Sequence, residues 1–110
     1  MINVAEDFTR YPGGRYREDG EHSGEEFRED VLVPALERAR ASSGRVIVVL
    51  DGVTGYPSSF LEEAFGGLVR ERHFTAGTLK SLLDIRAGAL FESYKVLAER
   101  YISNAKPKHD

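Results

Sequence analysis

The continuous apolar run at residues 46–50 constrains the fold more than any other feature of this chain. Its first four residues, Val46 to Val49, are β-branched, which favours an extended strand. A strand with one face in water alternates polar and apolar residues, and this run does not alternate. We therefore expect a central strand that is covered on both faces.

Helical patterns stand on either side of this run. Residues 27–39 and 60–69 carry apolar side chains at intervals of three, four and seven, which is typical of amphipathic helices. Strand–helix–strand order implies parallel neighbours joined by right-handed crossovers. The fold is therefore expected to be α/β.

Serine–glutamate pairs at capping-box spacing mark the predicted start of each helix. Ser23 with Glu26, and Ser59 with Glu62, would each satisfy two main-chain N–H groups reciprocally. Pro34 interrupts the first helical pattern and lacks an N–H group, so we expect a kink or a break at residues 32–34.

The two ends of the chain complete the predicted element order. Alternating apolar residues over 2–8 predict a strand, which a turn at Pro12-Gly13-Gly14 would reverse into a short strand at 15–17. Near the C-terminus we expect a strand from about residue 81 to 86, in a segment of which part could be helical, and an amphipathic helix over 90–102. The prediction is an α/β fold in the order β-β-α-β-α-β-α, with a small mixed sheet and three main helices.

Length and composition exclude several classes of protein. A chain of 110 residues is expected to form one domain, here residues 1–105, followed by a disordered C-terminal tail at 106–110. There are 15 basic and 18 acidic side chains, and this acidic balance disfavours nucleic-acid binding. Cysteine is absent, which removes disulfides, thiol nucleophiles and thiolate metal sites. With no signal-peptide pattern and no long apolar run, we expect a cytoplasmic protein without a membrane segment.

The candidate site is the loop over 51–59, at the carboxyl end of the predicted central strand. Ligands of open α/β sheets gather at that edge. Ser58 and Ser59 open the second helix there, where a phosphate would lie in a favourable field. Gly66-Gly67 indicates a close approach of that helix to the sheet or to another helix. The functional alternative is a flat face for a partner backbone or, if exposed, for a homodimer.

A second candidate is Gly13-Gly14-Arg15, which would hold an anion on main-chain amides and one guanidinium, or would simply form a turn. His22, His73 and His109 are far apart in sequence and form no metal-binding or catalytic motif. We therefore expect no metal, no cofactor and no enzymatic activity.

Four segments carry a resemblance to a known family: Gly13-Gly14-Arg15-Tyr16, residues 23–29, Leu50-Asp51-Gly52, and residues 58–68. The chain resembles the STAS-like domain family of unknown function (DUF4325 type), a relative of the STAS domains that include the anti-sigma factor antagonists. The resemblance implies a mixed sheet of four or five strands with helices. In the antagonists, an ATP-using anti-sigma kinase phosphorylates a serine at the start of the helix after the central strand, which releases the partner.

The matching position in this chain is Ser58 or Ser59. The antagonists have Asp-Ser-Ser-Gly there, where this chain has Pro57-Ser58-Ser59-Phe60. The resemblance implies a non-enzymatic regulatory module whose partner is a histidine-kinase-like ATPase. The alternative is a domain that senses a small molecule or an anion. The residues expected at the phosphoacceptor or partner site are Asp51, Tyr56, Ser58, Ser59, Phe60, Glu63, Gly66 and Gly67.

Overall fold

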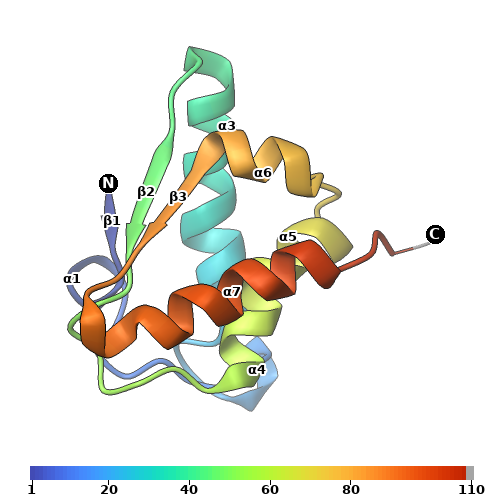
Figure 1. Cartoon of the computed structure of the whole chain (residues 1–110). Coiled ribbons are helices and arrows are strands. Elements are labelled where there is room, and N and C mark those ends of the chain that lie inside the picture. The colour runs from blue at the N-terminus through green and yellow to red at the C-terminus, as the bar shows by residue number, and fades with distance from the viewer. Residues whose placement is uncertain (109–110) are drawn as a thin grey trace.

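The structure is a computed structural model that describes residues 1–108. One sheet of three parallel strands, in the order β1-β2-β3, is built from β1 (Ile2–Asn3), β2 (Val46–Val49) and β3 (Leu83–Arg86). The predicted central strand is confirmed, because β2 lies between the other two (Figure 1). The described residues form a parallel three-stranded sheet, and not the mixed sheet of four or five strands that we expected.

The sheet is fully covered on one face only. Val46 and Val48 of β2 are buried, whereas Ile47 and Val49, on the opposite face, are half-buried. The prediction of two covered faces is therefore wrong. The apolar run correctly indicated a strand. It did not indicate full burial of both faces, because half-buried positions on the second face also carry aliphatic residues.

The predicted N-terminal hairpin is also wrong. After β1 the chain turns at once into α1 (Val4–Asp7), because the Asn3 side chain accepts a hydrogen bond from the Glu6 N–H at 3.1 Å and caps the helix. The expected return strand is a 3₁₀ turn, η1 (Arg17–Asp19). Since β1 pairs parallel to β2, no tight turn joins them.

The first long helix spans residues 24–42 as α2 (Gly24–Phe27), a π-type turn η2 (Arg28–Leu32) and α3 (Val33–Ser42). The wide turn ends at Leu32, two residues before Pro34 and at the start of the expected interruption, and proline cannot donate to the preceding turn. Ser23 caps the helix by accepting from the Glu26 N–H, as predicted. The reciprocal bond differs, because the Glu26 carboxylate accepts from the His22 N–H at 3.1 Å.

The second long helix spans residues 58–70 and has the same construction: α4 (Ser58–Leu61), a π-type turn η3 (Glu62–Gly66) and α5 (Gly67–Arg70). A short helix, α6 (Ala76–Leu82), then leads directly into β3. After β3 come a 3₁₀ turn, η4 (Ala89–Phe91), and the final helix α7 (Glu92–Asn104).

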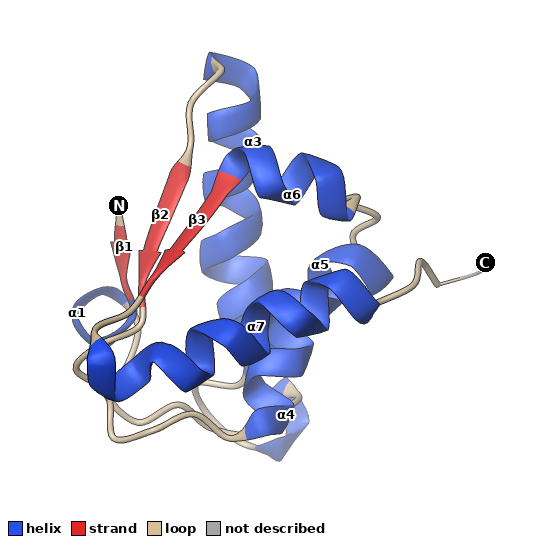
Figure 2. Cartoon of the chain, viewed as in Figure 1, coloured by secondary structure: helices blue, strands red, loops and turns tan. Residues whose placement is uncertain are grey.

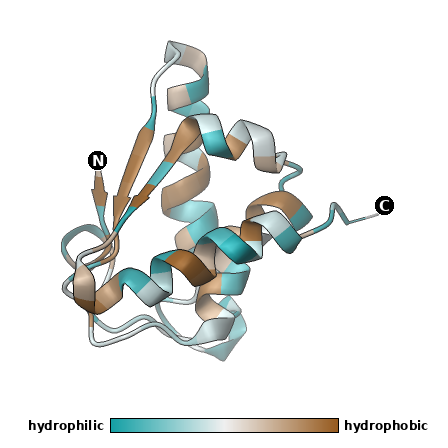
Figure 3. Cartoon of the chain, viewed as in Figure 1, coloured by the Kyte–Doolittle hydropathy of each residue, from teal (hydrophilic) through white to brown (hydrophobic). Residues whose placement is uncertain are grey.

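Helices make up most of the molecule, and the sheet lies at one side of it (Figure 2). In Figure 1, α7 crosses in front of helix 58–70, against which it packs. The strand β2 is strongly apolar along its length, whereas α7 is mixed (Figure 3). Phe27, Phe60 and Phe65 are fully buried and join the two long helices in one core. No helix within residues 1–108 is long and apolar enough to cross a membrane.

The C-terminal tail lies partly against helix 58–70. The Lys108 N–H donates to the Arg70 carbonyl at 3.0 Å, and its ammonium group lies 3.4 Å from the Glu71 carboxylate. The remainder of the predicted disordered tail, residues 109–110, is outside the described part of the chain.

Candidate partner-binding site

The carboxyl ends of the three parallel strands point to one corner of the molecule, where three loops meet (Figure 1). We call residues 10–12, 51–57 and 88–90 the carboxyl-end loop cluster. The Thr54 N–H donates to the Arg10 carbonyl at 2.9 Å. The Gly88 N–H donates to the carboxylate of Asp51, with 3.0 Å to each oxygen. Asp51 therefore joins the loops that follow β2 and β3.

Ser58 and Ser59 border this cluster at the start of helix 58–70. Ser58 is exposed and Ser59 is half-buried. The predicted Ser59–Glu62 capping box is wrong, because the helix begins at Ser58 and the capping position is Pro57, whose carbonyl accepts from the Phe60 N–H at 3.0 Å. Within residues 1–108, no hydrogen bond involves either serine hydroxyl, so the more exposed Ser58 is the accessible hydroxyl at this corner.

Tyr56 and Phe60 support this corner from inside and do not present a contact surface. The Tyr56 hydroxyl donates to the Leu50 carbonyl at 2.7 Å, and the residue is 6% exposed. Burial, reinforced by the nearby charge of Asp51, raises the pKa of Tyr56 well above its ordinary value. Its ring lies 5.8 Å from the ring of Phe60, which is fully buried. The expectation that these two aromatic residues meet a partner is therefore not supported.

Two apolar side chains of the loop cluster are instead exposed. Leu90 is 90% exposed and Tyr11 is 70% exposed. The sequence pattern assigned Leu90 to the apolar stripe of the last helix, but that helix begins only at Glu92. No sequence signal singled out Tyr11, because its position depends on the contact between Arg10 and Thr54.

Glu63 is buried, and it lies in an ion-pair network and not on a surface. Its carboxylate is 2.5 Å from Nη1 of Arg28, and the two side chains are only 4% and 5% exposed. The same Arg28 nitrogen donates to the Glu63 carbonyl at 2.9 Å. Arg15 and Arg70 each lie 3.2 Å from the other carboxylate oxygen of Glu63. Such complete pairing is what allows charges to be buried.

The neighbouring carboxylate of Glu62 completes this network, which consists of Arg15, Arg28, Glu62, Glu63 and Arg70. Glu62 accepts from Arg15 and, at 2.6 Å, from Arg70. Burial alone would raise the pKa of Glu62, but the hydrogen bonds from the two arginines outweigh it and hold the pKa below its ordinary value.

The predicted anion site at Gly13-Gly14-Arg15 is not supported by the geometry. The guanidinium of Arg15 is held by two carboxylates. The Gly13 N–H donates to the His22 carbonyl at 2.9 Å, and the Gly14 carbonyl accepts from Gly24 at 2.9 Å. This segment therefore packs along the start of helix 24–42, and the geometry gives the anion-sensing alternative no support.

Gly66 and Gly67 are buried inside the molecule, so they do not form the exposed face that we considered. A Cβ atom on Gly67 would lie 2.3 Å from Nη1 of Arg28. One on Gly66 would lie 2.7 Å from the Glu62 carboxylate and 3.5 Å from the Tyr101 carbonyl. Close internal packing is therefore the reason for these glycines.

The histidines and acids do not assemble into a metal site among residues 1–108. His22 packs its ring on Phe8, with 5.4 Å between ring centroids, and His73 is exposed. His109 lies outside the described residues.

The comparisons with known proteins place the chain in a family. A model of the STAS-like domain of unknown function (DUF4325) matches residues 23–87, which is more than half of the chain. The protein belongs to this STAS-like family, as its sequence resemblance indicated. No curated protein and no solved structure matches the chain. The matched segment contains both long helices, β2, β3 and the two serines.

Proposed function

We propose that this chain is a non-enzymatic regulatory module that binds a partner protein through the carboxyl-end loop cluster and the exposed start of helix 58–70. The observations that carry the proposal are the exposed Tyr11 and Leu90 of the loop cluster and the exposed Ser58 at the start of helix 58–70. Exposed aromatic and aliphatic side chains are typical of protein contacts. Membership of the STAS-like family supports a regulatory role of the anti-sigma-antagonist kind.

The proposed partner is a histidine-kinase-like ATPase, and the proposed switch is phosphorylation of Ser58. A phosphate adds nearly two negative charges. These charges would lie at the exposed start of helix 58–70, so a contact that buries this position would have to desolvate them. Ser59 is the less accessible of the two hydroxyl groups, which favours Ser58 as the acceptor.

Affinity capture from cells, followed by phosphosite mapping of the captured chain, tests this proposal. We expect an ATPase of the histidine-kinase-like class in the capture and phosphate on Ser58. The variant Ser58→Asp should weaken capture by about tenfold or more, which corresponds to about 1.4 kcal/mol. Ser81→Asp is the matched control, since Ser81 is exposed in α6 at the opposite end of β3. Undiminished capture by the double variant Ser58→Asp/Ser59→Asp would contradict the proposed switch.

A further inference from the structure

The strand β3 forms one edge of the sheet and pairs only with β2 among the described strands. The Leu50 N–H donates to the Arg86 carbonyl at 3.0 Å. Because main-chain groups of successive strand residues point to opposite sides, Asp84 and Arg86 bond to β2, whereas Leu83 and Ile85 do not. The Leu83 N–H already donates to the Leu79 carbonyl of α6, so Ile85 is the residue that directs its N–H and carbonyl to the free edge. Such an edge is a template for a further strand.

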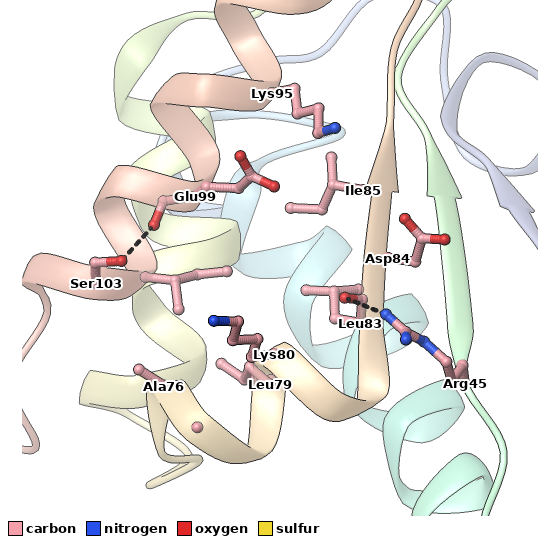
Figure 4. A pocket seen from close by; sticks show the side chains of 12 residues that line it. Arg45, Ala76, Leu79, Lys80, Leu83, Asp84, Ile85, Lys95, Glu99 and Ser103 are labelled. Atoms are coloured by element: carbon pink, nitrogen blue, oxygen red, sulfur yellow. Dashed lines mark hydrogen bonds between the residues drawn. The ribbon is translucent and has the colours of Figure 1, made fainter.

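A hollow of about 600 Å³ lies beside this edge, between β3, α6 and α7. Its floor is apolar and consists of Leu79, Leu83, Ile85 and Ile102. In Figure 4, the side chains of Leu83 and Ile85 extend from β3 toward the helices that close the hollow. The hollow therefore combines an apolar floor with main-chain hydrogen-bonding groups along one wall.

The rim of the hollow has an excess of positive charge. Lys80 and Lys95 extend into it (Figure 4), and within residues 1–108 neither lysine forms an ion pair. Arg45 reaches the Leu83 carbonyl at 3.5 Å. Two acidic residues, Asp84 and Glu99, also line the hollow. The carboxylate of Asp84 already pairs with Arg86 at 2.9 Å, so Glu99 is the acid that offsets part of the positive charge of the rim. The charge of the rim therefore complements an acidic ligand.

We propose that this hollow and the free edge of β3 bind an extended acidic segment of a partner protein, which adds a fourth strand to the sheet. Its main chain would pair with Ile85, alternate apolar side chains would cover the floor, and a carboxylate would meet Lys80 and Lys95. This is recognition by strand addition, in which main-chain bonds give affinity and side-chain pockets give specificity.

The surrounding helices favour a single segment over the sheet of a second copy. In Figure 1, α6 leads into one end of β3 and α7 extends away from the other end, so both helices flank the free edge. A four-residue strand such as β3 is about 13 Å long, which matches a peptide of four to six residues. This surface is separate from the carboxyl-end loop cluster, and the inference does not depend on the proposed function.

Peptide binding to the ¹⁵N-labelled full chain, followed by amide hydrogen exchange, tests the proposal. The probe is an acetylated and amidated hexapeptide, Glu-Val-Thr-Val-Glu-Val. The controls are the same peptide with lysine in place of glutamate, and the acidic peptide N-methylated at its central valine. We expect the acidic probe to slow exchange of the Ile85 amide by at least about tenfold, because that N–H gains a partner. The amides of Asp84 and Arg86 already bond to β2 and should not change.

Charge reversal at the rim gives the second measurement. Lys80→Glu/Lys95→Glu should weaken binding of the acidic probe by about tenfold or more, since two attractions become repulsions. Arg100→Glu/Lys106→Glu makes the same change of charge outside the hollow and should leave binding intact. The variant Ser58→Asp should also bind the probe normally, which separates this surface from the loop cluster.

Results of three kinds would overturn the inference. One is the absence of binding by the acidic probe at about 1 mM, a concentration that detects even weak contacts. Another is binding without protection of the Ile85 amide, or with equal affinity for the N-methylated peptide. The third is protection of Ile85 that rises with protein concentration alone, together with a doubled mass, which would assign the edge to a second copy of this chain.

Discussion

The pairing of Arg28 with Glu63 makes a sharp prediction about the variant Glu63→Gln. The substitution keeps the size of the side chain and removes its charge. Arg28 would keep its bonds to the Glu63 carbonyl at 2.9 Å and to Glu29 at 2.8 Å, but its side chain is only 5% exposed. Arg15 and Arg70 would lose the same carboxylate while keeping Glu62.

The magnitude follows from the burial of the pair. Removing one partner of a buried ion pair costs about 3–5 kcal/mol. The lower end applies here, because Arg28 keeps two acceptors, so we expect a loss of about 3 kcal/mol in the free energy of unfolding. For a domain of this size that loss lowers the melting temperature by roughly 12–20 °C. It is also a large part of a total stability of roughly 5–15 kcal/mol.

Urea unfolding followed by circular dichroism, together with a thermal scan, measures the effect. The control is Glu6→Gln, which removes an exposed pair with Arg10 whose side chains are 65% and 59% exposed. Exposed pairs contribute about 0–1 kcal/mol, so the control should change little. The dependence of unfolding on urea concentration should stay the same in both variants. Equal losses for Glu63→Gln and Glu6→Gln would refute the interpretation that Arg28 and Glu63 form a buried, fully paired ion pair.

Three further outcomes follow from the structure. Gly67→Ala should destabilise the protein by about 1–3 kcal/mol in thermal unfolding, because the new Cβ atom would meet Arg28. Gly77→Ala in α6, where a Cβ atom would meet nothing within 4 Å, should instead stabilise the protein by about 0.5–1 kcal/mol. The opposite order of stability would contradict the packing at Gly67. The lowered pKa of Glu62 contributes stability that is present above the unfolded pKa of about 4.3 and is lost as the pH falls through the folded pKa. When the pH is below about 4, the urea concentration at the midpoint of unfolding should therefore decrease. This decrease should be smaller in Glu62→Gln. Tyr56→Phe should cost about 1–3 kcal/mol, because a buried carbonyl loses its donor, and an unchanged melting temperature would show that water replaces the hydroxyl.

Local patterns predicted the elements that depend on local chemistry. The run at 46–50 became the central strand, and the three, four and seven spacing became both long helices to within a few residues. Pro34 marked the irregular turn of the first helix. The N-terminal strand was predicted too long: it ends at Asn3, because Asn3 caps a helical turn and this local bond outweighs the apolar alternation over residues 2–8.

The candidate site was predicted only in part, and the reason lies in long-range contacts. Ser58 and Asp51 were placed correctly at the carboxyl end of β2, because the topology of parallel sheets dictates that edge. Glu63 was expected at the partner site, yet it pairs inside the molecule with Arg28, which is 35 residues away in the chain. Arg15 looked available for an anion, yet it is bound by carboxylates 47 and 48 residues away.

The sequence by itself determined the family, the α/β class and the position of the central strand, because apolar periodicity and β-branching act over a few residues. Only the tertiary structure decided which charges are buried, which glycines are crowded and which edge of the sheet is free. Those properties depend on contacts between segments far apart in the chain. The hollow beside β3 is the clearest case: its lining comes from β3, α6, α7 and Arg45, and it exists only once these have packed.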